Sequence, residues 1–245
     1  GIKPKVGHLH ITTQALKEIE EIFSRIGFYR VRYPEVEWDY YAFSALNFPD
    51  DHPARDEWET FFIDEEKVDE KMGKRVLTPH TSSGQVREME RRDPPIRMMN
   101  ISRCYRREID VSHDVNFFQF EGLMIDKGVT IKNLKGTLQY FVDNFFGEGT
   151  EVRIRPYDFR FTEPSFEVDI KLYDGHPLSK KGWLEIGGAG MVHPNVLKAG
   201  GIDPDEYTGF AFGFGVERNK MVQGDTNIPD IRLIYGGDIR FLEQF

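Results

Sequence analysis

The sequence is poor in the features that mark several common classes of protein. It contains a single cysteine, Cys104, so neither a disulfide framework nor a cysteine zinc site can be built. No run of about 18 apolar residues occurs, and the first ten residues lack the apolar segment of a signal peptide. Neither GxGxxG between a strand and a helix, nor GxxxxGK[ST], nor HExxH is found. We therefore expect a cytoplasmic protein without a membrane partner, and we find no support for a Rossmann, P-loop or zinc-hydrolase site.

Positive charge is also scarce. Lys and Arg total 32 against 41 Asp and Glu, which gives a net charge of −9. A free-standing nucleic-acid binder needs clustered Lys and Arg, so any nucleic acid would draw most of its affinity from a partner or a further segment. Phenylalanine, in contrast, is abundant, with 20 residues in a chain of 245. This content is enough to fill the core of one large domain or two small ones.

The hydrophobic pattern predicts few helices and many strands. A helix is expected over residues 12–26, capped by Thr12 or Thr13 and closed by Gly27, and another over 131–146, capped by Thr130 and closed by Gly147. Shorter helices are predicted over 81–92 and 216–222, an irregular segment with a short helix over 39–55, and a solvated loop or hairpin over 64–74. Strands are predicted over 28–33, 75–78, 96–106, 117–126, 151–161, 165–174, 182–192 and 208–214. This order favours an α+β fold with a mostly antiparallel sheet flanked by helices.

The segment TGFAFGFGVER, residues 208–218, is the most informative stretch of the chain. Alternating Phe and Ala indicate a strand, and three glycines interrupt it before Glu217 and Arg218. Glycine inside a strand often marks the close approach of a ligand or another backbone. The segment therefore suits the floor of a pocket for a flat, charged ligand.

A second group of polar residues lies in the segment 103–123. Arg106 falls near the end of one strand, where a guanidinium group can bind phosphate oxygens. On the returning strand Gln119 and Glu121 are two residues apart, so they share a face and can hold an ammonium group. The alternative is a charged hairpin with a polar strand facing solvent, which this segment alone favours.

Three further segments each allow a functional and a structural interpretation. The hydroxyls of TPHTSS, residues 78–83, can bind an anion, or Thr81 and Ser82 can simply cap a helix. Phe159 and Phe161 fall on one face of a predicted strand and can clamp an aromatic substrate, or can be plain core. Glu185 stands beside a glycine cluster that suits a metal-linked phosphate or an ordinary tight turn.

Taken together and in order, these segments resemble the three motifs of the class II aminoacyl-tRNA synthetases. More narrowly, DHPARDEWETFF, TPHTSSGQVREM, VSHDVNFFQFEG, LEIGGAGMVHPNVL, TGFAFGFGVER and the closing IPDIR…GGDIRFLEQF resemble the alpha chain of phenylalanyl-tRNA synthetase. The resemblance covers nearly the whole chain and implies one catalytic domain over residues 1–245, with an antiparallel sheet of six or seven strands. It implies that L-phenylalanine is activated by ATP and transferred to tRNA(Phe), with Mg²⁺ and a beta subunit in an (αβ)₂ assembly.

The resemblance also implies roles for single residues. Arg106 and Arg218 match the catalytic arginines that hold the ATP phosphates, and Glu108, Phe118 and Gly215 match further positions of the ATP site. His80 and Ser82 match contacts to the amino-acid carboxylate and ammonium groups, Phe159 and Phe161 the pair that holds the substrate ring, and Ala211 the pocket floor. The other implied residues are Gln85, Gln119, Glu121, Gly188 and Gly190 for the amino acid, and Glu163 and Glu185 for Mg²⁺.

The sequence departs from the family pattern in three ways. The coiled-coil arm that usually precedes this domain is not part of this sequence, and the connection after Glu108 is one residue shorter than usual. Phe118 stands where a histidine is common, and Phe62 where a tryptophan or tyrosine is common. Two other functions therefore stay open. One is a paralogue that binds or activates an amino acid without charging tRNA, and the other is a non-catalytic subunit that scaffolds a partner.

Overall fold

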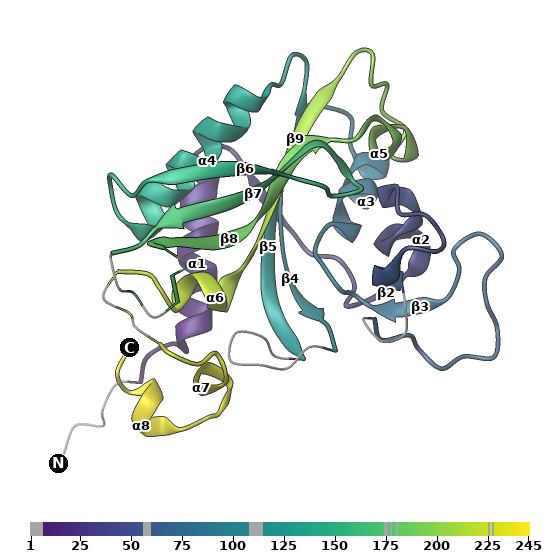
Figure 1. Cartoon of the computed structure of the whole chain (residues 1–245). Helices are drawn as coiled ribbons and strands as arrows, with labels where there is room; N and C mark the ends of the chain where they lie inside the picture. Colours follow the sequence, from purple (N-terminus) through teal and green to yellow (C-terminus); the bar gives the residue numbers. More distant parts are fainter. Residues whose placement is uncertain are drawn as a thin grey trace.

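A seven-stranded sheet forms the centre of the computed structural model, which describes residues 7–55, 60–107, 115–173, 176, 178, 179, 181–224, 226 and 228–245. The strand order is β1-β4-β5-β9-β8-β7-β6 (Figure 1). Every neighbouring pair is antiparallel except β1 and β4, which run parallel. The predicted α+β class and the mostly antiparallel sheet are confirmed.

The elements have the following bounds. The large sheet contains β1 (Tyr29–Val31), β4 (Ile96–Tyr105), β5 (Asn116–Asp126), β6 (Val152–Tyr157), β7 (Thr162–Lys171), β8 (Trp183–Val192) and β9 (Thr208–Gly215), and a small sheet contains β2 (Val36–Trp38) and β3 (Arg75–Leu77). The helices are α1 (Ile11–Ser24), α2 (Asp39–Ala42), α3 (Ser83–Arg91), α4 (Ile131–Phe146), α5 (Pro194–Ala199), α6 (Val216–Lys220), α7 (Arg232–Tyr235) and α8 (Ile239–Leu242). Two 3₁₀ turns, η1 (Ser44–Leu46) and η2 (Pro53–Arg55), follow α2.

The two long helices form where the sequence predicts them, with one correction. The helix α4 has the predicted bounds, because the Thr130 and Asn133 side chains form a capping box and Gly147, with φ 112°, follows the last turn. The helix α1 is capped by His10, whose ring nitrogen accepts from the Thr12 backbone N–H, and not by Thr12 or Thr13. Thr12 is instead inside the helix and buried.

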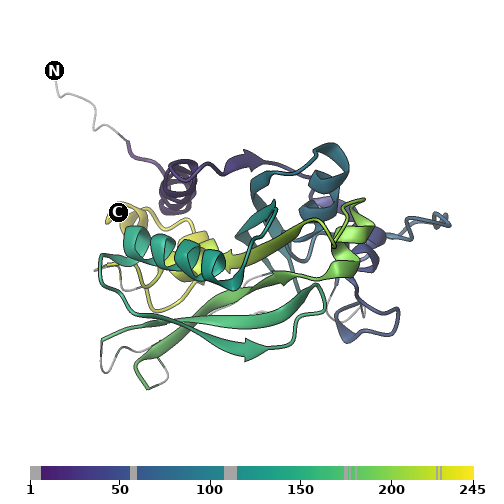
Figure 2. The ribbon, with the colours of Figure 1, turned by 90° about the horizontal axis from the view of Figure 1, so that it is seen from above.

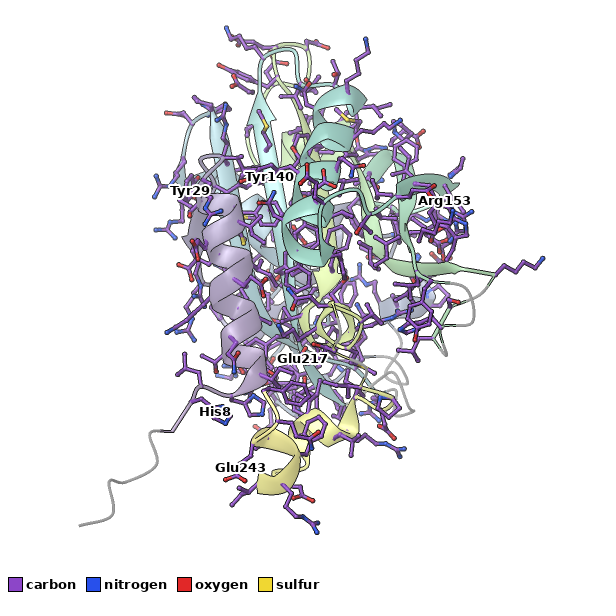
Figure 3. All side chains as sticks on the ribbon, turned by 90° about the vertical axis from the view of Figure 1, so that its left-hand side faces the viewer. His8, Tyr29, Tyr140, Arg153, Glu217 and Glu243 are labelled. Atoms are coloured by element: carbon purple, nitrogen blue, oxygen red, sulfur yellow. The ribbon has the colours of Figure 1, made fainter. Side chains whose placement is uncertain are left out.

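One face of the sheet is covered by α1 and α4, which Figure 2 shows from above and Figure 3 shows side by side in front of the strands. Phenylalanine rings fill this layer. Phe23 of α1 stacks on Phe212 with ring centroids 5.2 Å apart, and Phe141 of α4 stacks on Phe214 at 5.7 Å. The rings of β9 are therefore packing residues, and truncating one to alanine would cost about 3–5 kcal/mol of stability.

The strand β5 supplies side chains to both faces of the sheet. Phe120 is fully buried in the phenylalanine layer, and a Cβ added to Gly122 would lie 2.2 Å from the Phe212 ring. Gln119 and Glu121, two residues apart, point to the opposite face. There Glu121 stands level with Gly213 of β9, which stands level with Gly188 of β8. Because Gly213 and Gly188 carry no side chain, space for a cavity remains on this face beside Glu121.

The second face of the sheet carries a smaller core and the cavity. Helices α3 and α5 pack there over Met98, Leu123 and Ala211. The segment that contains α2, η1 and η2 closes one side of the cavity. It is irregular with a short helix, as predicted for residues 39–55. The start of α1 lies beside the C-terminal segment that contains α7 (Figure 1), where the His10 ring nitrogen is 3.0 Å from the Ile234 carbonyl oxygen.

Candidate active site

A cavity of about 580 Å³ lies against the sheet between β5, β8 and β9. Its walls come from the start of α3, the turn between β6 and β7, the segment that contains α2 and η1, and the start of α6. A volume of this order is typical of sites for small-molecule substrates. The residues that line it are both apolar and charged, and they fall into three groups: an acidic centre, an aromatic wall and an arginine end.

The acidic centre is Glu121, which is only 1% exposed to solvent. The Ser82 hydroxyl donates to its Oε2, the Thr81 hydroxyl donates to Oε2 at 3.2 Å, and Gln85 Nε2 donates to Oε1 at 2.8 Å. Burial raises the pKa of this carboxyl to about 7, against the opposing effect of the three donors. Among the residues that the structure describes, no cation pairs with Glu121, so a ligand's ammonium group would gain a charge-assisted bond here.

These contacts decide between the two interpretations of residues 78–83. The helix α3 begins at Ser83, and the Ser82 side chain makes no capping hydrogen bond. The Thr81 and Ser82 hydroxyls are turned into the site toward Glu121, and the Thr81 backbone N–H donates to Gln119 Oε1 at 3.1 Å. Simple helix capping by these hydroxyls is therefore wrong. A polar strand face turned to solvent is wrong as well, since Glu121 is buried.

His80 lines the cavity next to this centre and is held in a stack of rings. Its centroid is 6.3 Å from that of Phe48 and 6.4 Å from that of Phe161, with both pairs nearly parallel. Burial first, and the positive charge of Arg106 second, lower the pKa of His80 to about 3. The imidazole is therefore neutral at physiological pH and can only donate or accept a hydrogen bond.

The aromatic wall contains Phe159 and Phe161, whose rings stack with centroids 5.7 Å apart. The two residues do not lie on a strand, as the sequence predicted, because β6 ends at Tyr157 and β7 begins at Thr162. They belong to the turn between these strands, where the Ser165 hydroxyl accepts from the Phe159 backbone N–H at 3.0 Å. The rings nevertheless reach the cavity together, and Tyr157 continues the wall with its ring 4.7 Å from Phe159.

The floor beneath these rings is made of small residues with different tasks. Gly188 admits the Phe159 ring, because a Cβ there would lie 2.6 Å from two ring carbons. Ala211 lines the cavity next to it. Gly190 is outside the set of lining residues, and its added Cβ would lie 2.5 Å from Thr162 Cβ. Its small size therefore serves the packing of β8 against the start of β7.

At the other end of the cavity two arginines face inward. Arg106 follows β4 directly, donates from Nε to the Pro79 carbonyl at 3.0 Å, and lies 5.2 Å from the centre of the Phe117 ring. Arg218 on α6 is 3.3 Å from Glu185 Oε2, and both side chains are about one-third exposed. A pair of this exposure is worth little, so a bound phosphate can replace Glu185 as the partner of Arg218. Gly215, just before α6, lines the same end.

Phe117, and not Phe118, is the ring that lines this end of the cavity. Phe118 packs on the phenylalanine layer, with the guanidinium of Arg103 5.2 Å from its ring centre. The period of two along a strand explains the correction, because Phe117 shares the face of Gln119 and Glu121. The same rule applied to the sequence would have found it.

Two predicted residues need separate comment. Glu108 lies outside the described residues, together with the rest of the shortened connection over 108–114. Glu163 is exposed at the start of β7 and is not among the residues that line the cavity, whereas Glu185 is. Within the described residues no cluster of three His, Cys, Asp or Glu side chains could hold a metal ion. Glu185 thus offers a single carboxylate, which suits a Mg²⁺ ion held mainly by substrate phosphates and water.

Comparison with known proteins identifies the class to which this fold belongs. The family model described as tRNA synthetases class II core domain (F) matches residues 1–245, so the chain belongs to the class II tRNA synthetases. A solved pyrrolysyl-tRNA synthetase from Desulfitobacterium hafniense superposes with a TM-score of 0.65 over 91% of this chain and 72% of that one. At 18% sequence identity this likeness concerns the fold alone.

Sequence relatives narrow the class to one family. The phenylalanine–tRNA ligase alpha subunit of Caldicellulosiruptor saccharolyticus is 51% identical over all of this chain and 71% of that protein. The alpha subunit of the same name from Myxococcus xanthus is 48% identical over 98% of this chain and 70% of that protein. Within its class, this chain therefore belongs to the phenylalanine–tRNA ligase alpha subunits.

Proposed function

We infer that this chain activates L-phenylalanine with ATP and transfers the phenylalanyl group to tRNA(Phe). One observation carries this function: a single cavity holds a buried carboxylate, a pair of stacked phenylalanine rings and two arginines. These three groups match the ammonium group and ring of phenylalanine and the phosphates of ATP. Belonging to the phenylalanine–tRNA ligase alpha subunits supports the choice of substrates.

The amino-acid end would be bound by groups that are already oriented. The ammonium group would lie against Glu121 and Gln119, with the Ser82 and Thr81 hydroxyls and Gln85 completing the hydrogen-bond network. The neutral His80 would donate to the substrate carboxylate without adding charge to it. Because these donors are fixed before the substrate arrives, little conformational entropy is lost on binding.

The substrate ring would contact the edges of Phe159 and Phe161 above Ala211. Each aromatic pair of this kind contributes about 0.5–1.5 kcal/mol beyond the buried area. The depth of the pocket is set by the Ala211 methyl group, so a larger side chain there would shorten it. Selection of phenylalanine is thus assigned to ring packing and to the size of one floor residue.

ATP would lie at the arginine end, with its base against Phe117 and its phosphates between Arg106 and Arg218. A carboxylate oxygen of phenylalanine attacks the α-phosphorus, the bond to the β-phosphate oxygen breaks, and pyrophosphate leaves. The attacking carboxylate is already ionised, so no general base is required. The two guanidinium groups stabilise the negative charge that builds on the phosphoryl oxygens. Glu185, which lines this end of the cavity, would help hold Mg²⁺, and the ion would supply further positive charge to the phosphates.

The assembly and setting are part of the same proposal. We assign a beta-subunit partner in an (αβ)₂ enzyme and a single catalytic domain over residues 1–245, and we place the enzyme in the cytoplasm. The net charge of −9 supports a division of labour in which a partner or further segment supplies most of the affinity for tRNA. No helix within the described ranges has both the length and the apolar character needed to cross a membrane.

The direct test is ATP–pyrophosphate exchange with each amino acid in turn, with the beta chain supplied, followed by charging of tRNA(Phe). Exchange with phenylalanine and charging of this tRNA are expected. Exchange with another amino acid alone would refute the substrate assignment, and adenylate formation without charging would favour the paralogue. A pure scaffold is disfavoured because Arg106 and Arg218 both line the cavity, and calorimetric binding of ATP and phenylalanine would exclude it.

A further inference from the structure

The rings that line the substrate pocket lie on a turn, and a turn has no strand ladder to fix it. Within the hairpin, residues 158–161 are held by two local contacts at Phe159. The Ser165 hydroxyl is bonded to the backbone of Phe159 and Thr162, and the Thr162 backbone N–H donates to the Phe159 carbonyl at 3.2 Å. The chain is exposed at Asp158 and Arg160, on the outer side of the turn. The position of the rings therefore depends on contacts made from elsewhere in the chain.

Two distant elements hold the backbone of this turn. Asn47, which ends η1, donates from its side-chain Nδ2 to the Arg160 carbonyl at 2.8 Å. The backbone N–H of His193, before α5, donates to the Phe161 carbonyl at 3.0 Å. Asn195 then donates from Nδ2 to Asn47 Oδ1 at 2.9 Å, so both ends of the Asn47 amide are engaged. The turn is thus joined to residues more than 100 positions earlier and about 30 positions later.

The backbone of Asn47 serves the same wall. Its φ of 64° and ψ of 22° are left-handed, a conformation that asparagine tolerates better than most residues. The reversal lets the Phe48 N–H bond the Phe43 carbonyl at 3.2 Å and places the Phe48 ring 5.8 Å from Phe161. Asn47 itself is absent from the cavity lining. Asn47 therefore affects the aromatic wall without touching the cavity, through its side-chain hydrogen bond to the Arg160 carbonyl and through the backbone reversal that positions Phe48.

We propose that Asn47 is a positioning residue for phenylalanine recognition, which fixes the turn carrying Phe159 and Phe161 and orients Phe48 against it. The inference rests on the proposed function, because it assigns these rings to the substrate. It concerns only the phenylalanine end of the cavity, since Arg106 and Arg218 are held by other elements. Loss of the Asn47 amide should therefore weaken phenylalanine binding and leave ATP binding unchanged.

Two substitutions separate the side chain from the backbone. Asn47→Gly keeps the left-handed conformation and removes the amide, whereas Asn47→Asp keeps an acceptor for Asn195 but cannot donate to the Arg160 carbonyl. In the assembled enzyme each should raise KM for phenylalanine about threefold to tenfold in pyrophosphate exchange, the loss expected for one hydrogen bond. KM for ATP and kcat should stay as in the wild type.

The matched control is Asn144→Ala. Asn144 is exposed on α4 and donates from Nδ2 to the Tyr140 carbonyl at 2.8 Å, so it loses a similar bond far from the cavity. Its KM for phenylalanine should not change. Asn195→Ala supports the test if the Asn47 variants fold poorly, because it removes only the bond to Asn47 and should give a smaller rise of the same kind.

The outcomes distinguish this inference from the function on which it rests. A wild-type enzyme that does not exchange with phenylalanine refutes the proposed function. An active wild type whose Asn47 and Asn195 variants keep the original KM for phenylalanine refutes the positioning role alone. Equal rises in KM for phenylalanine and for ATP, or a similar rise in Asn144→Ala, would indicate a general loss of structure and would also overturn it.

Discussion

The buried carboxylate of Glu121 should make phenylalanine binding depend on pH between 6 and 8. Burial raises its pKa to about 7, and an ammonium ligand gains a charge-assisted bond only when the carboxylate is ionised. With this pKa, about nine-tenths of the sites are ionised at pH 8 and about one-tenth at pH 6. The substrate ammonium group stays protonated over this range. KM for phenylalanine should therefore rise about tenfold as pH falls from 8 to 6.

The assay is pyrophosphate exchange at a series of pH values with wild type, Glu121→Gln and Glu217→Gln. Glu121→Gln should raise KM for phenylalanine about tenfold or more at pH 8, the cost of a charged hydrogen bond, and should remove its pH dependence. Glu217 is the necessary control, because burial raises its pKa to about 7 as well and it also lines the cavity. His80, with its pKa near 3, does not titrate here. A pH dependence that survives in Glu121→Gln, or disappears in Glu217→Gln, would refute the reasoning.

Three other changes test the cavity and the fold. Gly188→Ala puts a Cβ 2.6 Å from the Phe159 ring, so this ring must move by about 1 Å. KM for phenylalanine should therefore rise about tenfold or more while KM for ATP stays unchanged, and an unaltered KM for phenylalanine would contradict this placement. Ala211→Gly should let para-substituted phenylalanines support exchange, and failure of every such analogue would argue against its place at the floor. The folded-state pKa of Glu121 lies above its usual 4.5, so ionising it as pH rises from about 5 to 7 should cost the free protein up to about 3 kcal/mol of stability, in addition to the loss from Glu217 over the same range. A smaller slope of stability against pH is therefore expected for Glu121→Gln in urea titrations, and an unchanged slope would contradict this assignment.

The sequence predicted best those features that depend on neighbouring residues. The bounds of α4 follow from a cap, a stripe and a closing glycine, all within one stretch of chain. The shared face of Gln119 and Glu121 follows from the period of a strand. The resemblance added the choice of the two arginines, and the structure brings Arg106 and Arg218 to the same end of one cavity.

The errors came where a local pattern has two structural solutions. The alternation in YDFRF fits a strand, yet β6 ends at Tyr157 and the two rings share a side by virtue of a turn. The hydroxyls of Thr81 and Ser82 resemble helix caps, but a buried carboxylate 40 residues away takes them instead. Asn47 was a turn signal within residues 39–55, but neither it nor Phe48 carried a signal for a role at the pocket wall, because their contacts depend on how an irregular segment folds over a distant turn.

The row Glu121, Gly213, Gly188 has a consequence for how substrate length is measured. These residues are level on three adjacent strands, so Glu121, the proposed ammonium site, and Gly188 beneath Phe159 are separated by two strand spacings, roughly 10 Å. That separation is maintained by the backbone ladder of the sheet, which cannot stretch to suit a longer ligand. The sheet thus fixes the distance between Glu121 and Gly188. Acceptance of a different amino acid would require substitutions at or near these positions, because the strands themselves cannot move apart.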